Sequence, residues 1–298
     1  MAVLILAAVI WSVGSNWAQV SDDLRRVPPG TLALALALGF AAPVLTMMGW
    51  RRLLADLGTT LPVPPAAGIF FVGQLGKFVP GSVWSVLAQA EMGARLNVPR
   101  RRTAVVGVVS VVLSLATGLA IGIPALPVLL RGEDSRAVAV AALAVIPLLV
   151  IGLHPWVLNG VLARVLTRLR REPLEHPLTG AAILAMTAWF LAAWLCAGLS
   201  VTVLIGSLAP SASTGQRLLA GVAGFALASA GGMLAVLFPA GVGVRDGLLL
   251  LMLEKLMPLP TAMAIAVLAR FITTLADVVL AGIGWVWARA HHLLGQRA

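Results

Sequence analysis

The sequence is poor in charged residues, contains no tyrosine and has a single cysteine. Only 11% of its 298 residues are charged, whereas about a quarter are charged in a soluble globular protein. So few charged side chains cannot cover the surface of a water-soluble domain of this size. Cys196 alone forms neither an intrachain disulfide nor a cluster of thiolate metal ligands. These shortages exclude disulfide-stapled folds and argue against a soluble one.

Apolar residues are abundant instead, at 60% of the chain. Several apolar runs reach the length of about 20 residues that crosses the hydrocarbon core of a bilayer. We predict an all-α polytopic integral membrane protein, a single transmembrane domain over 1–298, in the cell (plasma) membrane. Its six full transmembrane helices are expected at residues 1–20, 30–50, 103–130, 136–153, 178–206 and 260–288.

The formal net charge is +10, and 19 of the 21 basic residues are arginines. They are scattered at the ends of apolar runs, as the positive-inside rule distributes them, so no nucleic-acid partner is expected. Within 155–171, apolar residues recur at helical spacing against Arg164 and Arg168. This pattern predicts an amphipathic helix on an anionic leaflet. An ordinary basic connecting loop with one helical turn is the alternative.

Two regions, 66–98 and 217–257, are interrupted by proline and glycine. The first contains Lys77-Phe78-Val79-Pro80-Gly81 and the second contains Phe238-Pro239-Ala240-Gly241-Val242-Gly243-Val244-Arg245-Asp246. A helix broken inside a membrane survives only where protein or a water-filled cavity satisfies the freed backbone groups. We therefore predict two re-entrant helical hairpins. The rival interpretation is that 217–238 crosses the membrane fully.

Orientation follows from the cationic residues. With two hairpins and six spans, twelve cationic residues fall on one side and six on the other, which predicts that both termini are cytoplasmic. The segments 1–131 and 136–288 then repeat the order span, span, hairpin, span in opposite directions. This layout predicts an inverted-topology repeat with opposed hairpins, in which substrates bind where broken helices meet near the midplane.

The first break predicts an anion site. A half-helix that starts after Gly81 presents unpaired N–H groups from Ser82 onward at the positive end of its dipole. Lys77 lies on the approach, and the hydroxyl of Ser85 adds a donor. Trp84 follows the half-helix start and is a candidate for lining a cavity against an acyl chain, with core packing as the alternative.

The second break repeats this chemistry with Gly241, Gly243 and Arg245. Glycines let the backbone approach a ligand closely, and the planar fork of arginine fits the oxygens of a phosphate. The alternative is that the glycines only permit tight packing and that a buried carboxylate neutralises Arg245.

Four further ionisable groups are predicted at membrane depth: Glu91, Asp246, Arg270 and Asp277. Arg270 and Asp277 are seven residues apart, so they share a helix face. We expect these groups to tune charge by pairing with Lys77, with Arg245 or with each other. Alternatively, a carboxylate among them carries a proton and couples transport to the proton gradient.

Catalytic motifs are missing from the sequence. No Gly-x-Ser-x-Gly motif, nucleotide-binding loop or histidine pair with metal-ligand spacing occurs. We expect no enzyme activity, no cofactor and no metal site.

The two breaks resemble the signatures of a known family. Gly73-Gln74-Leu75-Gly76-Lys77-Phe78-Val79-Pro80-Gly81-Ser82-Val83-Trp84 is similar to the Gly-Lys-Tyr-x-Pro-Gly-x-x-Trp segment of the flippase-domain family of lysylphosphatidylglycerol synthases, which includes stand-alone YbhN-like and AglD-like members. The second break resembles its Pro-x-Gly-x-Gly-x-Arg-Glu signature. Phe78 stands for the usual Tyr, and Asp246 for the usual Glu.

The resemblance implies that an anionic phospholipid or a polyprenyl-phosphate-linked saccharide is flipped between leaflets without nucleotide hydrolysis. Membrane lipids are then the expected partners, together with a lipid-modifying enzyme or glycosyltransferase as a further partner. Two alternatives remain: a secondary transporter of a small soluble anion, and a non-transporting scaffold for a glycosyltransferase. The oligomeric state is not predicted.

Overall fold

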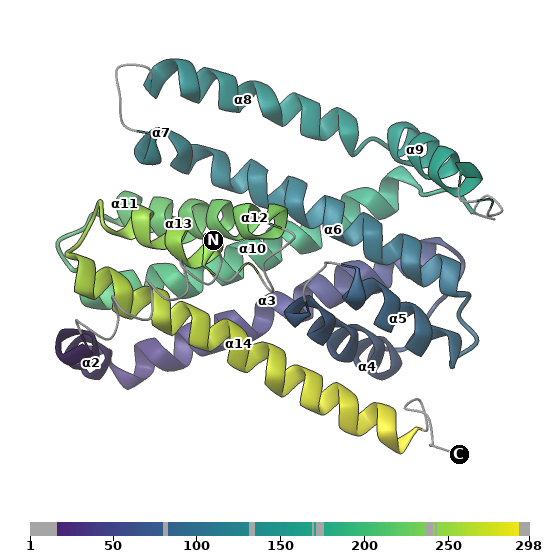
Figure 1. The fold of residues 1–298 in the computed structure, drawn as a ribbon, viewed down its shortest axis with the longest axis horizontal. Helices are drawn as coiled ribbons and strands as arrows, with labels where there is room; N and C mark the ends of the chain where they lie inside the picture. Colours follow the sequence, from purple (N-terminus) through teal and green to yellow (C-terminus); the bar gives the residue numbers. More distant parts are fainter. Residues whose placement is uncertain are drawn as a thin grey trace. The chain divides into compact units, whose positions relative to one another are not determined.

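The structure is a computed structural model that describes residues 17–79, 83–130, 135–168, 170, 176–235, 241 and 243–291. Every regular element within these ranges is a helix (Figure 1). Because a membrane core offers no water to exposed backbone groups, helices that satisfy their own hydrogen bonds are the expected solution for so apolar a sequence.

Within the part of the chain that the structure describes, five helices are long and apolar enough to cross a membrane, or up to six if a bent pair counts as one span. Four of the five agree with predicted full spans. The five are α3 (Pro29–Asp56), the continuous run Arg100–Leu129 formed by α6 (Arg100–Gly122), η2 (Ile123–Ala125) and α7 (Leu126–Leu129), then α10 (Gly180–Leu208), the run Thr214–Leu234, and α14 (Leu259–Ala290).

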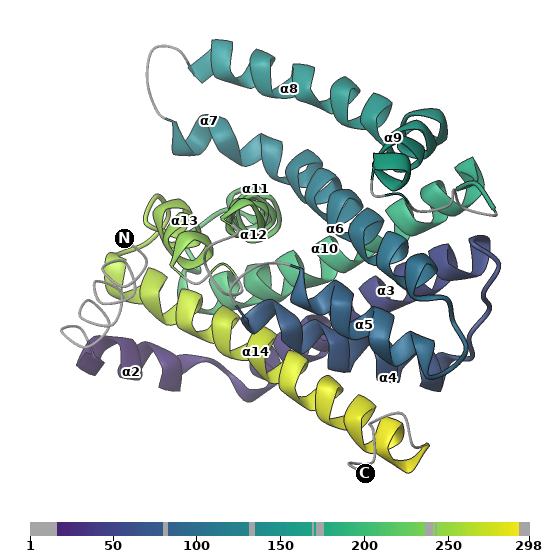
Figure 2. The same cartoon turned by 45° about the vertical axis from the view of Figure 1, so that its right-hand side comes forward.

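The first predicted hairpin consists of two short helices on either side of a break. α4 (Val63–Gln74) continues into the 3-10 turn η1 (Leu75–Phe78), and α5 (Trp84–Ala94) follows the break. α4 and α5 lie side by side (Figure 1, Figure 2). Gly73 faces Gln89, and Gly76 faces the backbone of Trp84 and Ser85. Because later residues of one arm face earlier residues of the other, the arms run antiparallel.

The second hairpin has a longer first arm. This arm joins α11 (Thr214–Leu218), the π-helix η3 (Leu219–Gly224) and α12 (Phe225–Leu234), and the second arm is α13 (Val244–Leu253). α12 and α13 lie side by side in both views (Figure 1, Figure 2). Gly224 faces Met252 and Gly232 faces Arg245, so these arms are antiparallel too.

The first arm of the second hairpin is itself long enough to be a candidate span. Its length therefore agrees with the rival interpretation, in which this segment crosses the membrane fully. Its packing on α13 agrees with the hairpin interpretation. The order span, hairpin, span occurs twice, as α3, α4–α5, α6 and as α10, α11–α13, α14. The opposite orientation of the two repeats stays a prediction.

The remaining helices lie between these elements in the sequence. α2 (Trp17–Arg26) precedes α3, and the rest of the predicted span 1–20 lies outside the described residues. α8 (Ser135–Gly152) is a helix at the place of the predicted span 136–153, and its part Ala144–Gly152 is a candidate span only together with α9. α9 (Pro155–Arg168) is the expected helix of the region 155–171, and it is bent by 60° from Ala144–Gly152.

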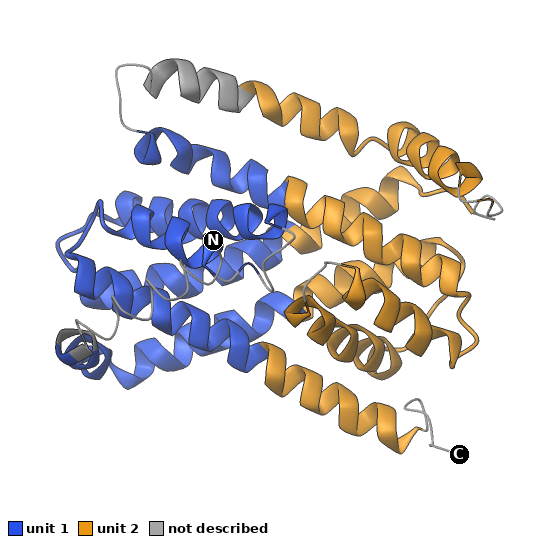
Figure 3. Ribbon diagram, in the orientation of Figure 1, with its two compact units in different colours: residues 1–43, 117–143, 191–276 blue, residues 44–116, 144–190, 277–298 orange. Residues whose placement is uncertain are grey.

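Two compact units make up the chain, and each has its own apolar core (Figure 3). Unit 1 comprises residues 1–43, 117–143 and 191–276 and contains the second hairpin. Unit 2 comprises residues 44–116, 144–190 and 277–298 and contains the first. The long helices α3, α6, α10 and α14 contribute residues to both units, so the units do not coincide with the sequence halves 1–131 and 136–288.

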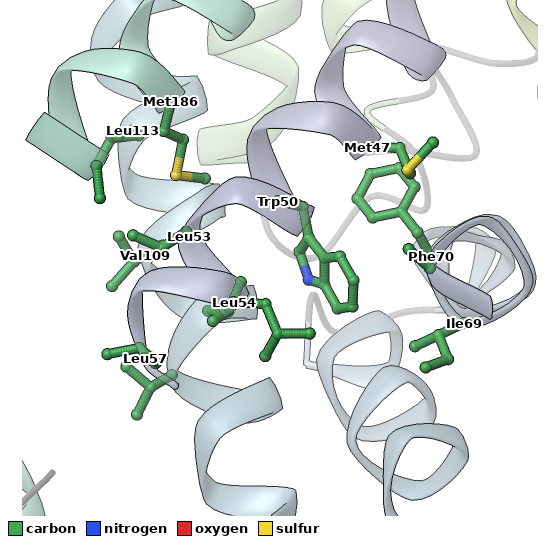
Figure 4. Close-up of a cluster of buried hydrophobic side chains, with 14 of the residues drawn as sticks. Met47, Trp50, Leu53, Leu54, Leu57, Ile69, Phe70, Val109, Leu113 and Met186 are labelled. Atoms are coloured by element: carbon green, nitrogen blue, oxygen red, sulfur yellow. The ribbon is translucent and has the colours of Figure 1, made fainter. Parts of the chain in front are cut away.

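The core of unit 2 surrounds Trp50 of α3 (Figure 4). Its indole packs against the ring of Phe70 in α4 with ring centroids 5.8 Å apart, and both side chains are almost completely buried. In unit 1 the core includes Phe225 and Leu249, one from each arm of the second hairpin. Each hairpin therefore has arm residues packed into the core of its own unit.

Candidate functional sites at the two helix breaks

In unit 2 an ion pair lies in the 3-10 turn that precedes the break of the first hairpin. Nζ of Lys77, in η1, lies 2.7 Å from Oδ2 of Asp277 in α14. The Lys77 side chain is 36% exposed and that of Asp277 only 15%. The ammonium also lies 5.6 Å from the centroid of the Phe78 ring. Asp277 is thus the pairing partner of Lys77, one of the arrangements expected from the sequence.

The residues around this break divide into packed and exposed groups. Ser85 is buried, at the place where Gly76 approaches α5. Trp84 is 48% exposed and so is not a core residue of unit 2. Gly81 and Ser82, both predicted at the phosphate, lie outside the described residues.

In unit 1 the second break carries a cluster of three charges. Nε of Arg245 lies 3.7 Å from Oδ1 of Asp246, and an Nη atom of Arg270 lies 3.6 Å from Oδ2 of the same carboxylate. These side chains are 15%, 19% and 25% exposed for Arg245, Asp246 and Arg270. The second Nη of Arg245 donates a hydrogen bond of 3.1 Å to Oγ1 of Thr273 in α14.

Two glycines shape the start of α13. Gly241 and Gly243 have φ angles of +65° and +85°, in the left-handed region that L side chains rarely adopt. A methyl group on Gly241 would also lie 2.9 Å from Cα of Gly232. The N–H of Gly243 donates to Oδ2 of Asp246 at 3.4 Å, so this carboxylate binds both the backbone at the helix start and the arginines.

Phe225 was not anticipated as part of this cluster. The guanidinium carbon of Arg245 lies 5.3 Å from the centroid of its ring, within the range of a cation–π interaction. Phe225 lies 20 residues before Arg245 in the sequence and in no motif, so only the antiparallel packing of the hairpin brings the two together.

Glu91 forms an exposed ion pair with Arg100. It lies near the end of α5, where Nε and an Nη atom of Arg100 donate hydrogen bonds of 2.9 and 3.0 Å to its two carboxylate oxygens. These hydrogen bonds and the charge of Arg100 hold the pKa of Glu91 below its usual range. The Glu91 side chain is 53% exposed, as expected of a surface ion pair.

Each unit therefore places cations beside a helix break, with different contacts to carboxylates. In unit 2 an ammonium contacts one carboxylate, and in unit 1 two guanidinium groups contact the same carboxylate. Among the residues that the structure describes, no group of three His, Cys, Asp or Glu side chains could hold a metal ion.

Comparison with known proteins supports the resemblance found in the sequence. No curated protein sequence matches the chain. A family model described as the lysylphosphatidylglycerol synthase TM region matches residues 1–281, and this family is associated with lipid flipping. The match includes both helix breaks and all the helices up to the last turns of α14. The chain is therefore a multi-pass membrane protein that belongs to the lysylphosphatidylglycerol synthase TM region family.

Proposed function

We propose that the protein moves an anionic phospholipid or a polyprenyl-phosphate-linked saccharide between the leaflets of the membrane. The phosphate is contacted by Lys77 at one helix break and by Arg245 at the other. Membership of a family associated with lipid flipping supports this proposal.

The surface around Lys77 is the observation that carries it. This partly exposed cation lies within a stretch of exposed apolar side chains in the same hairpin. They are Leu75, Val79, Val83, Trp84 and Leu87, which are 40%, 46%, 60%, 48% and 54% exposed. A cation next to exposed apolar surface fits a ligand with an anionic head and an acyl chain. A small soluble anion has no acyl chain that could contact these exposed apolar side chains.

We further propose that both termini are cytoplasmic and that the two hairpins enter from opposite leaflets. The unequal distribution of arginines supports the first statement, and the repeated order span, hairpin, span supports the second. In this arrangement each leaflet has one cation-bearing break that its lipids can reach.

Leaflet exchange in liposomes tests the function. The protein is reconstituted with fluorescent phospholipids, and exchange is followed by quenching the outer leaflet. Wild type is expected to exceed protein-free vesicles, and Arg245→Ala to be slower by about tenfold or more, because charge-assisted hydrogen bonds to the phosphate are lost. Arg25→Ala, which removes an exposed arginine of unit 1, is the control. Exchange at the protein-free rate in all vesicles would contradict the proposal.

A further inference from the structure

The helix α9 carries two exposed arginines, Arg164 and Arg168, one helical turn apart. We propose that α9 binds the headgroups of anionic phospholipids at the surface of the membrane, and that these two guanidinium groups contact the lipid phosphates. This binding surface is separate from the helix breaks, and it does not require that lipid move between leaflets.

The leucines of α9 are packed against the protein. Leu158 belongs to the apolar core of unit 2, Leu162 packs against that core, and Leu166 is buried. Residues spaced by four lie on one face of a helix. An amphipathic helix that binds a bilayer by itself buries such a face in the lipid. Contact between α9 and a membrane therefore has to use the rest of its surface.

The rest of this surface changes from apolar to cationic around the helix. Val161 and Val165 are nearly half exposed. Arg164 and Arg168 are exposed as well. Because successive residues turn by about 100°, the two valines lie between the leucine face and the two arginines. The valines can then touch lipid while the long arginine side chains extend to the headgroups.

The bend before α9 places this helix at the end of an apolar surface. Leu148, Val150 and Ile151 of α8 are each more than half exposed, as expected of side chains that face lipid. A 60° bend then separates Ala144–Gly152 from α9 (Figure 1, Figure 2). With Ala144–Gly152 upright in the bilayer, the bend turns α9 nearer to the plane of the membrane than to its normal.

Trp156, in the first turn of α9, indicates the same level in the membrane. Its side chain is 79% exposed, and tryptophan is enriched at membrane–water interfaces. The alternative is that Ala144–Gly152 and α9 form one broken span. That position would put Arg164 and Arg168 in the hydrocarbon, where charged side chains are costly, and a position at the surface avoids this cost.

The charge of α9 suits an anionic lipid. The helix contains no Asp or Glu, and within the part of the chain that the structure describes neither Arg164 nor Arg168 forms an ion pair. The planar guanidinium fits the oxygens of a phosphate. A basic residue near an anionic membrane surface strengthens binding by about fivefold, which corresponds to about 1 kcal/mol. A zwitterionic lipid has no net charge to provide this attraction.

A fluorescent label on α9 tests the binding surface. In a Cys196→Ser background, Val161→Cys carries bimane close to both arginines. The protein is reconstituted in phosphatidylcholine vesicles that contain equal fractions of nitroxide-labelled phosphatidylglycerol or nitroxide-labelled phosphatidylcholine. Quenching by each nitroxide lipid measures how strongly that lipid associates with α9. Leu148→Cys, on the exposed apolar surface of α8, is the control position for the label.

The label at Val161→Cys is expected to report an association about fivefold stronger for phosphatidylglycerol than for phosphatidylcholine. Arg164→Gln with Arg168→Gln should abolish this preference, and so should salt of about 1 M, at which the screening length is about 3 Å. Arg164→Lys with Arg168→Lys keeps the charge and should retain most of the preference. The label at Leu148→Cys should be quenched equally by the two lipids in every variant.

The depth of α9 is measured with phosphatidylcholine that carries the nitroxide near the headgroup or at the end of the acyl chain. The first should quench Val161→Cys more strongly, and the second should quench Leu148→Cys more strongly. Equal association of the two headgroups with α9, or a preference that survives both glutamine substitutions, would overturn the binding of anionic lipid. Stronger quenching of Val161→Cys from the chain end, or no quenching from either position, would overturn the location at the membrane surface.

Discussion

Two aspartates hold the cations of the helix breaks, and they do so in different ways. Asp277 forms a short pair with Lys77, whereas Asp246 is shared by Arg245 and Arg270. The sequence identified these groups as candidates because ionisable residues at membrane depth are rare. It could not assign the pairs, since pairing depends on which residues the hairpins bring against α14. Arg270 and Asp277 share a helix face, yet the ion pairs of both are to hairpin residues.

The Lys77–Asp277 pair predicts a measurable coupling at the residue scale. Lys77→Met and Asp277→Leu should each destabilise the protein, because each leaves a charge without its counterpart. The double variant should be more stable than the sum of the single changes indicates, by about 1–2 kcal/mol, since Lys77 is more than a third exposed and its charge is partly screened. Unfolding of all four proteins in one detergent measures this coupling, and strictly additive changes would show that the pair contributes nothing.

At the scale of elements, hydropathy located the spans and the Pro-Gly breaks located the hairpins. The close packing of the arms was not predictable, because it depends on glycines such as Gly76 and Gly232, which meet the backbone or Cβ of the other arm only after folding. The π-helix η3 had no signal in the sequence. Residues 214–234 fitted both a hairpin arm and a span, since apolar length alone does not distinguish the two.

Two glycine substitutions test the hairpin packing in opposite directions. In Gly76→Ala the added methyl group meets the backbone of Trp84 and Ser85, so stability should fall by about 1–3 kcal/mol. Gly247→Ala in α13 meets nothing within 4 Å and should raise stability by about 0.5–1 kcal/mol, because alanine favours the helix. Thermal unfolding of both variants checks this. Equal effects would mean that the arms of the first hairpin are not closely packed.

One side chain of α9 is bonded to the backbone of the segment that precedes α10. Nδ2 of Asn159 donates to the carbonyl of Leu178 and its Oδ1 accepts from the N–H of the same residue, both at 2.9 Å. Asn159→Ala should therefore cost about 1–3 kcal/mol and speed hydrogen exchange at Leu178. Thr167→Ala, which removes a hydroxyl on the exposed part of α9, is the matched control. Unchanged exchange at Leu178 would count against this anchoring role.

At the scale of the whole molecule, the sequence halves and the compact units differ. The halves 1–131 and 136–288 were drawn from the order of elements, whereas packing groups residues from both halves into each unit. The sequence could not show this, because a long helix that contributes residues to two cores appears in the sequence as one uninterrupted apolar run. α3, α6, α10 and α14 are such helices.

Cysteine labelling tests the membrane topology of the whole chain. In a Cys196→Ser background, single cysteines replace Arg95, Gly215 or Gln296. With an impermeant maleimide on intact cells, only Gly215→Cys should react if the second hairpin is re-entrant and both termini are cytoplasmic. Lysed cells give the full signal for each variant. Reaction of Gln296→Cys in intact cells would instead show that 214–234 crosses the membrane fully.

The π-helix η3 has a consequence for the aromatic ring that faces Arg245. A π turn contains one residue more than an α turn, and this surplus sets the angular position of every residue after it up to Leu234. Removing Val222 would turn the following helix by about 100° and swing Phe225 away from the guanidinium, leaving every charged residue in place. If the deletion variant keeps its fold but loses the proposed lipid exchange, the extra residue of the π turn is needed to place the Phe225 ring against Arg245.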